Sequence, residues 1–471
     1  MHFIDLLIFV VYILIVLGVG FYFHARNKDS SDYYTGGNDM GSVHIGLSVV
    51  ATDVGGGFSI GLGGLGFVMG LSGSWMLFTG LVGAWLSAVF LIPKVINRAH
   101  HLKILTFPQL LLDTYGKRVA LVAGVISFIG YLGFTSSQLL AGAKLAVGTF
   151  PDLGINQAII IMGAVAVLYT VFGGIKAVIY TDTFQWLLLM GGLIFLGLPL
   201  AYYSLGGYQE IMQYLPDRFF DLSNVSWIQL MNWFITIVPI WFVGMTLYQR
   251  IYACRDERTA KRAWYIAGVF EYPVMAFMGV LLGLFARVAV EQGMFTEAGF
   301  TSAASMDAEL GLPMLLRHIL PVGLMGLMLS AYFSAIMSTA DSCLLAASGN
   351  LLTDILGVDN QHKNGVRISQ WITLAVGAVA LILATMMNSV LELMLMSYAF
   401  MVSGLLVPVL AMLLSPNPDP AAAFWSMAIG GGMTLALTIS GLPIPFGFDP
   451  ILVGVLLALA AYLIIHYIHG K

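Results

Sequence analysis

An aspartate in a glycine-rich apolar segment is the first feature that suggests chemistry. Asp53 lies in the sequence SVVATDVGGGFSIGLGGLG, which holds seven glycines between residues 55 and 66. Each glycine costs a helix about 1 kcal/mol relative to alanine, which disfavours a continuous helix here. A break in apolar surroundings frees backbone carbonyls, and these are tolerated where they face protein or a solvated cavity. We therefore expect an interrupted helix whose carbonyls can bind a cation. The alternative, glycines that only permit close helix packing, leaves Asp53 unexplained.

A second segment, SAYFSAIMSTADSCLLAASGN at residues 330–350, is rich in hydroxyl groups. On a helix, Ala335, Ser338, Thr339 and Ser342 fall at i, i+3, i+4 and i+7 and share one face. Hydroxyl and carbonyl oxygens suit a hard monovalent cation, whereas a divalent ion normally requires several carboxylates. The alternative is that these hydroxyls bond back to their own helix or join neighbouring helices.

Three further acids fall within or near apolar segments. Asp182 lies in GGIKAVIYTDTFQW, where it is either a functional group or an acid at the start of a helix. Glu271 precedes Pro273, and Glu392 is expected at the edge of its segment. We assign neither glutamate to a site.

The composition predicts the kind of fold that positions these residues. Hydrophobic residues make up 59% of the 471 and charged residues only 9%, too few to cover a water-soluble surface. Apolar stretches of roughly 20 residues, each long enough to cross a bilayer, recur along the chain. We therefore predict an all-α integral membrane protein with about thirteen transmembrane helices. The expected spans are 3–23, 42–67, 73–96, 119–148, 155–173, 178–205, 227–249, 264–290, 319–353, 368–388, 390–414, 422–441 and 449–468.

The basic residues predict the orientation. With the N-terminus outside, sixteen of the 20 lysines and arginines fall in cytoplasmic loops. Lys144, Arg218, Arg287 and Arg317 are the four exceptions. Basic loops resist translocation, so this bias predicts an external N-terminus, a cytoplasmic C-terminus and an odd number of spans.

Other classes of protein fit less well. The net charge of −4 suggests no nucleic-acid partner, and the two cysteines suggest neither a disulfide framework nor a metal cluster. The nine histidines fall near span ends or in loops, so a membrane-embedded enzyme is not expected. A channel is disfavoured because no filter motif repeats.

Taken together, these segments resemble the sodium/solute symporter family, which includes bacterial sodium/proline, sodium/sialic acid and sodium/sugar symporters. The matching segments are SAIMSTADS, GGIKAVIYTDTFQ, the break around Asp53, WFVGMTLYQR at 241–250 and YAFMVSGLLVPV at 398–409. The resemblance implies one transporter domain over 1–471 with a LeuT-type inverted repeat of five plus five helices. The first repeat is expected over 42–205 and the second over 227–414, with additional helices at 3–23, 422–441 and 449–468.

The resemblance also implies where ions bind. The principal sodium site would use the carbonyls of Ala51, Val54 and Ala335 and the hydroxyls of Ser338 and Thr339. A second site, present in some members, would correspond to Asp182, Ser338, Asp341 and Ser342. One or two sodium ions are therefore expected.

The solute is expected near the break. Asp53 matches an aspartate of the sodium/proline members, and sugar-transporting members carry polar groups where this chain has Phe58 and Gly244. An amino acid or another small polar or carboxylate solute is therefore favoured over a sugar. The predicted lining residues are Asp53, Gly55, Gly56, Phe58, Trp75, Trp241, Met245 and Tyr248.

The function expected from this resemblance is alternating-access symport of sodium and a small solute by a monomer in the plasma membrane, here a bacterial inner membrane. A proton-coupled symporter that uses Asp53, Asp182 and Asp341 is the alternative.

Overall fold

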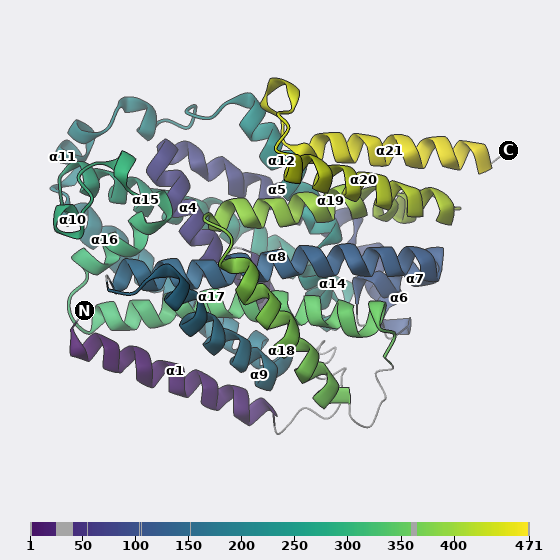
Figure 1. The fold of residues 1–471 in the computed structure, drawn as a ribbon, viewed down its shortest axis with the longest axis horizontal. Coiled ribbons are helices and arrows are strands. Elements are labelled where there is room, and N and C mark those ends of the chain that lie inside the picture. Colours follow the sequence, from purple (N-terminus) through teal and green to yellow (C-terminus); the bar gives the residue numbers. More distant parts are fainter. Residues whose placement is uncertain are drawn as a thin grey trace.

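The described part of the chain folds into helices (Figure 1), and its longer connections cover residues 215–226 and 292–310. The computed structural model describes residues 2–24, 41–53, 55–102, 104, 106–150, 152–358 and 365–469. No β-strand occurs in these ranges, so the prediction of an all-α fold is confirmed. Within the helices, the side chains of residues 19–21, 23, 24, 56, 58 and 173–183 are not described.

The principal α-helices are named in chain order. They are α1 (Phe3–His24), α3 (Ser42–Asp53), α4 (Gly56–Met69), α5 (Trp75–Phe90), α6 (Ile92–Leu102), α7 (Phe107–Tyr115), α8 (Lys117–Thr149), α9 (Ile155–Gly192), α10 (Leu198–Ser204), α11 (Gly207–Tyr214), α12 (Trp227–Val243), α13 (Met245–Ala253), α14 (Glu257–Val269), α15 (Ala276–Glu291), α16 (Gly311–Ile319), α17 (Leu324–Gly349), α18 (Gly365–Ala384), α19 (Val390–Leu414), α20 (Pro420–Ser440) and α21 (Pro450–His469). Short π-helical segments extend three of them: η2 (Leu193–Gly197), η4 (Phe270–Met275) and η8 (Asn350–Ile355).

Many of these helices are long and apolar enough to cross a membrane. Within the described residues there are ten such helices, or eleven if the bent pair α12 and α13 counts as one span. This measure treats Ser59–Phe90 as one segment and leaves out the short helix α3. The total of thirteen spans therefore stays a prediction.

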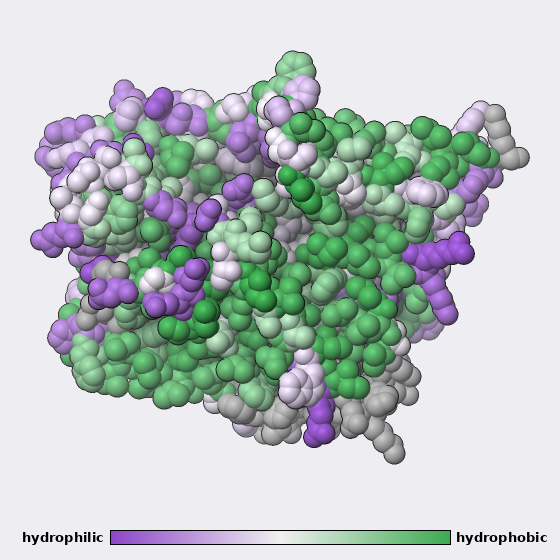
Figure 2. Space-filling view, in the orientation of Figure 1, coloured by the Kyte–Doolittle hydropathy of each residue, from purple (hydrophilic) through white to green (hydrophobic). Residues whose placement is uncertain are grey.

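The surface of the bundle fits a bilayer. Figure 2 shows a broad apolar band between two ends at which polar residues gather. Large apolar side chains point outward from several helices, and Phe195 and Ile439 are 76% and 78% exposed. In water such a surface would drive association, whereas lipid tails solvate it. The chain is thus a multi-pass membrane protein.

Helix α17 lies at the centre of the bundle. In the apolar window of Leu324–Ile355, 94% of the residues are buried, compared with 22% for α21 at the periphery. Helices α3, α4, α8 and α9 all pack against α17. The hydroxyl-rich segment is therefore enclosed by protein and does not face lipid. The two chain ends lie at opposite ends of the bundle (Figure 1).

Candidate functional site

Two helices are interrupted next to the central helix. Helix α3 ends at Asp53 and α4 begins at Gly56, so the glycine-rich segment breaks where the sequence predicts. A second break, which the sequence analysis does not predict, separates α12 from α13 at Gly244 and bends the chain by 42°. Both α3 and α13 pack against α17. The breaks therefore leave main-chain polar groups without helical partners beside the hydroxyl-rich segment.

The first break brings Ala51 and Thr339 into contact. The Thr339 hydroxyl donates a hydrogen bond of 2.9 Å to the carbonyl oxygen of Ala51 and one of 3.3 Å to that of Ala335. This close approach needs glycine at position 55, because a Cβ there would lie 1.8 Å from Thr339 Oγ1. Three oxygens predicted to bind one ion thus lie together.

The remaining residues of the predicted principal site are described only in part. Ser338 is buried on the same helix, next to Thr339. Val54 lies outside the described residues. The contact between α3 and α17 is thus observed, whereas the complete ligand set stays a prediction.

A buried arginine holds the second break to the first. Arg250 of α13 is fully buried, and one guanidinium nitrogen donates hydrogen bonds to the hydroxyls of Thr52 at 2.6 Å and Ser342 at 2.7 Å. Another nitrogen donates to the Thr246 carbonyl at 3.2 Å. Arg250 therefore joins α3, α13 and α17, a role that the sequence analysis did not assign to it.

The predicted second ion site contains a buried acid. Asp341 is fully buried and accepts a hydrogen bond from the hydroxyl of Thr170 on α9. Ser342 accepts the bond from Arg250. The Asp182 side chain lies outside the described residues. Asp341 and Ser342 are thus surrounded by protein groups, and the second site stays a prediction.

Asp53 belongs to a buried polar cluster. Tyr398 of α19 donates a hydrogen bond of 3.3 Å to its carboxylate. The carboxyl group of Glu271, from segment η4, lies close enough to interact with it. Glu271 is fully buried, although the sequence analysis assigned it to no site. Its position next to Asp53 depends on folding, so spacing along the chain gives no signal for it.

The predicted solute-lining residues lie in three places. Asp53, Gly55 and Gly56 lie at the first break, and the Phe58 side chain is not described. Met245 and Tyr248 follow the second break. The Met245 sulfur accepts a hydrogen bond from the Phe107 amide at 3.1 Å. The Tyr248 hydroxyl donates one to the Phe242 carbonyl at 2.8 Å. Trp241 is buried against Gly83 of α5. Trp75 instead donates to the Leu222 carbonyl at 2.8 Å, in the connection before α12. The structure thus groups most of these residues around the two breaks and places Trp75 elsewhere.

Gln138 is another polar residue that the sequence analysis missed. It is fully buried in α8, and a Cβ at Gly57 would lie 2.0 Å from its Oε1 atom. That oxygen has no hydrogen-bond partner among the described residues. A buried amide acceptor therefore faces the first turn of α4.

A cavity of about 870 Å³ opens at the end of the bundle where α4 ends. Its walls come from α4, α12, α19, residues 307–309 and the connection between α20 and α21. Glu392 lines it, whereas the predicted ion-binding and solute-lining residues do not. Helix α4 thus runs from the first break to this cavity.

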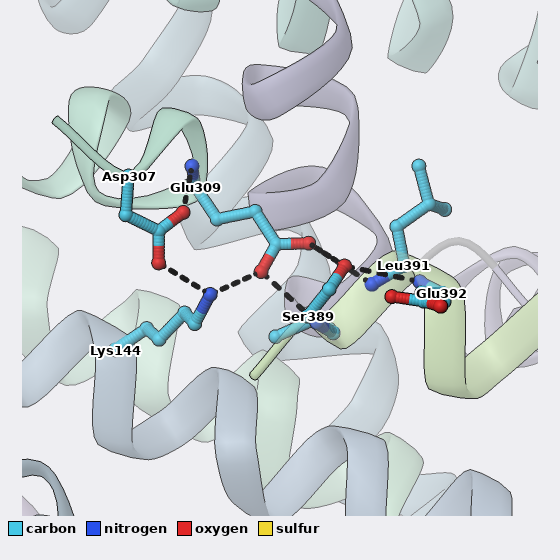
Figure 3. Close-up of polar contacts among 7 residues, drawn as sticks. Lys144, Asp307, Glu309, Ser389, Leu391 and Glu392 are labelled. Carbon is cyan, nitrogen blue, oxygen red and sulfur yellow. Dashed lines mark hydrogen bonds and ion pairs between the residues drawn. The ribbon is translucent and has the colours of Figure 1, made fainter. Parts of the chain in front are cut away.

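A buried ion-pair cluster borders the cavity (Figure 3). Lys144 of α8 lies 2.6 Å from both Asp307 Oδ2 and Glu309 Oε2. Glu309 also accepts hydrogen bonds from the amides of Val390 and Leu391 and from the Ser389 hydroxyl, at 2.9, 3.0 and 3.1 Å. Glu309 thus caps the start of α19 and links it to α8 through Lys144.

Two interrupted helices that meet a buried oxygen-rich helix, inside a lipid-exposed bundle, define a class of protein. Interrupted membrane helices beside a buried site are typical of secondary transporters. The fold agrees with this class. The structure matches that of a Na+-coupled sialic acid symporter in its substrate-bound outward-open state with a TM-score of 0.79, over 98% of this chain and 97% of the other at 21% identity. The fold is thus of the LeuT type with additional helices.

Sequence comparison identifies the family. Residues 33–430 match the model of the sodium:solute symporter family, and the chain belongs to that family. It is 27% identical to the high-affinity proline transporter PutP of Bacillus subtilis, over 82% of this chain and 81% of that protein. It is 26% identical to sodium/glucose cotransporter 1 of Oryctolagus cuniculus, over 74% of this chain but only 58% of the longer relative. The protein is therefore a transporter and not an enzyme, and sodium-coupled solute uptake is its general function.

Proposed function

We propose that this protein takes up a small organic solute with one sodium ion per transport cycle, by alternating access around the break between α3 and α4. The hydrogen bond between Thr339 and Ala51 is the observation that carries the proposal. It brings a freed carbonyl and a hydroxyl, both buried, within 2.9 Å of each other. Oxygens at that spacing can contact the same small cation.

The proposed ion site contains no carboxylate of its own. Its ligands are the carbonyls of Ala51, Val54 and Ala335 and the hydroxyls of Ser338 and Thr339. Such neutral oxygens suit a monovalent cation, because a divalent cation usually needs carboxylates to balance its charge. A sodium ion bound there would join α3 to α17, so its binding and release would change how tightly the two helices associate.

We assign sodium coupling to the principal site because the positively charged side chain of Arg250 lies near the predicted second sodium site. The Arg250 guanidinium donates to Ser342 at 2.7 Å. A positive charge so close to a ligand oxygen opposes a second cation in a medium of low dielectric constant. Asp341, with Asp182 as its predicted partner, would balance Arg250 in this arrangement.

One ion supplies enough energy for strong accumulation. Each sodium ion that crosses about 100 mV yields roughly 2.3 kcal/mol, and a tenfold concentration gradient adds about 1.4 kcal/mol. One ion per neutral solute could therefore sustain an accumulation on the order of 10² to 10³.

The solute is proposed to bind beside the two breaks. Asp53, Gly55, Gly56 and Phe58 would form one wall, and Trp241, Met245 and Tyr248 the other. An amino acid or other small polar solute is favoured over a sugar, because Phe58 and Gly244 offer no side-chain hydrogen bonds to hydroxyl groups. In this proposal Trp75 has no contact with the solute.

The orientation follows from the loop charges. We place the N-terminus outside and the C-terminus in the cytoplasm of a bacterial cell, in the plasma membrane, with the cavity beyond α4 facing outward. A monomer contains every proposed ligand, so it would suffice for transport.

Uptake into proteoliposomes tests the proposal against proton coupling. The driving force is a sodium gradient without a pH gradient, and the readout is accumulation of a radiolabelled solute selected from a panel of amino acids, carboxylates and sugars. Accumulation above the outside concentration supports sodium symport. Accumulation that requires a pH gradient instead, with no effect of sodium, would favour proton coupling through Asp53, Asp182 and Asp341.

A further inference from the structure

We propose that Asp53 and Glu271 together bind a positively charged ammonium group carried by the solute. This inference rests on the proposed function and extends it by naming a chemical class of solute. It starts from two acidic side chains that come from distant parts of the chain, α3 and the η4 segment before α15.

The two carboxyl groups are deeply buried. Asp53 is 7% exposed and Glu271 is not exposed at all. They are close enough to interact with each other. Within the described ranges, neither forms an ion pair with a lysine or arginine. The polar neighbour of the Glu271 carboxyl group is the Asp53 carboxyl group, and no N–H or hydroxyl donor among the described residues reaches the Glu271 oxygens. Two carboxyl groups held together in the protein interior are costly to ionise, so the arrangement calls for a positive group or a proton between them.

The surrounding helices leave space for these carboxyl groups. Position 80 of α5 is a glycine, and a Cβ there would lie 2.2 Å from Glu271 Oε2. Gly83, one turn further along α5, makes the same kind of room for Trp241, whose indole nitrogen also has no partner among the described residues. Helix α5 thus presents a glycine face to a buried glutamate and a buried indole donor.

Aromatic side chains lie next to Asp53. Tyr398 donates to Asp53, and its ring packs edge-on against Phe134 with centroids 5.0 Å apart. Phe134 in turn contacts Tyr131, whose hydroxyl accepts a hydrogen bond from the Thr246 amide at the second break. A row of aromatic rings therefore runs from Asp53 to the second break.

This combination favours an organic ammonium group over a divalent metal ion. Ammonium groups bind well to carboxylates flanked by aromatic faces, because the ring quadrupole attracts the cation. A divalent metal ion such as Ca²⁺ instead collects six or more oxygen ligands. Here two carboxyl groups and one phenol provide fewer oxygens than such a shell needs. Gln138, whose unpartnered Oε1 lies against Gly57, is a further acceptor near the α3–α4 break.

Matched solutes test the ammonium requirement on purified full-length protein in nanodiscs. Thermal shift is measured in sodium with pairs that differ mainly in the cationic nitrogen: L-alanine and L-lactate, L-proline and tetrahydrofuran-2-carboxylate, glycine betaine and 3,3-dimethylbutanoate. We expect at least one nitrogen-containing member to stabilise the protein, with no stabilisation by its partner. Equal stabilisation by both members of the responding pair, or a response only to solutes without a cationic nitrogen, would overturn the proposal.

Variants then locate the contact. Glu271→Gln is expected to weaken binding of the cationic solute about ten- to a hundredfold, as loss of a charge-assisted hydrogen bond does. Binding of ²²Na⁺ without solute should change little, and Glu297→Gln, an exposed acid, should change neither. Unaltered solute affinity in Glu271→Gln, or loss of ²²Na⁺ binding with solute affinity kept, would contradict the proposal. Should Glu271→Gln not yield folded protein, Tyr398→Phe provides the same test, because it removes the donor to Asp53 and keeps the aromatic ring.

A failure of the underlying symport mechanism gives a different result. If the proposed function is wrong, sodium will not affect the binding of any solute, and ²²Na⁺ will not bind to the wild type. If only the ammonium contact is wrong, sodium dependence remains while the response to the matched pairs or to Glu271→Gln is lost.

Discussion

The hydroxyl of Thr339 donates a hydrogen bond to the carbonyl oxygen of Ala51, which lies 288 residues earlier in the chain. This contact links the end of α3 to the central helix α17. The next two residues extend the pattern, because Thr52 accepts from Arg250 of α13 and Asp53 accepts from Tyr398 of α19. Three consecutive residues at one break therefore contact three different helices. A local change at this break is well placed to alter how those helices pack.

Removal of the two hydroxyls should weaken sodium activation. We expect Ser338→Ala combined with Thr339→Ala to raise the sodium concentration for half-maximal uptake about ten- to a hundredfold, because two ion ligands are lost. Uptake at varied sodium in proteoliposomes measures this. Ser330→Ala is the matched control, since Ser330 is buried in the same helix and bonds back to the Gly326 carbonyl at 2.7 Å. Unchanged sodium activation in the double variant would refute the site.

A methyl group at position 55 should block the contact between the helices. In Gly55→Ala the new Cβ would lie 1.8 Å from Thr339 Oγ1 and 2.6 Å from the Ala51 carbonyl oxygen. Overpacking of this kind costs about 1–3 kcal/mol, so we expect the uptake rate to fall at least about tenfold. The control is Gly432→Ala in α20, where a Cβ meets nothing within 4 Å. Wild-type rates in both variants would show that close approach at the break is dispensable.

The buried Arg250 should contribute strongly to stability. Arg250→Met leaves the Thr52 and Ser342 hydroxyls and the Thr246 carbonyl without this donor. Each buried acceptor that loses its donor costs about 1–3 kcal/mol, so we expect a marked fall in the thermal midpoint in detergent. Arg255→Met, at a side chain that is 65% exposed, should have little effect. Similar midpoints for the two variants would argue against the structural role of Arg250.

The thermal stability of the protein should depend on Glu309 far more than on Asp307, the two acids that pair with Lys144. The Glu309 side chain is 8% exposed and holds three donors of the α19 start, whereas Asp307 is 41% exposed. Breaking a buried pair costs about 3–5 kcal/mol, but an exposed pair is usually worth less than about 1 kcal/mol. Glu309→Ala should therefore lower the thermal midpoint well below that of Asp307→Asn. The reverse order would be inconsistent with the observed burial.

Local sequence patterns predicted the break after Asp53 and the hydroxyl-bearing face of α17. Glycines disfavour a helix through residue-level entropy, and hydroxyl spacing follows helical geometry, so both features can be seen before folding. The break after Asp53 and the shared face of Ser338 and Thr339 on a buried helix agree with these predictions.

The sequence analysis missed the residues whose role depends on tertiary contacts. Glu271 lies beside Pro273 in a π-helical segment, and only the packing of that segment on α5 brings it near Asp53. The second break has one glycine, Gly244, which is too weak a signal when tertiary packing decides where a helix bends. Tyr398 and Gln138 look like ordinary core residues in the sequence. Their partners lie elsewhere in the chain, and periodicity does not report them.

Equilibrium binding of ²²Na⁺ to purified protein, without solute, tests the central claim most directly. Wild-type protein should bind sodium saturably, and Thr339→Val should weaken that binding about tenfold while the thermal midpoint stays close to that of Ser330→Ala. Sodium affinity that is the same in Thr339→Val and the wild type would contradict an ion site between α3 and α17.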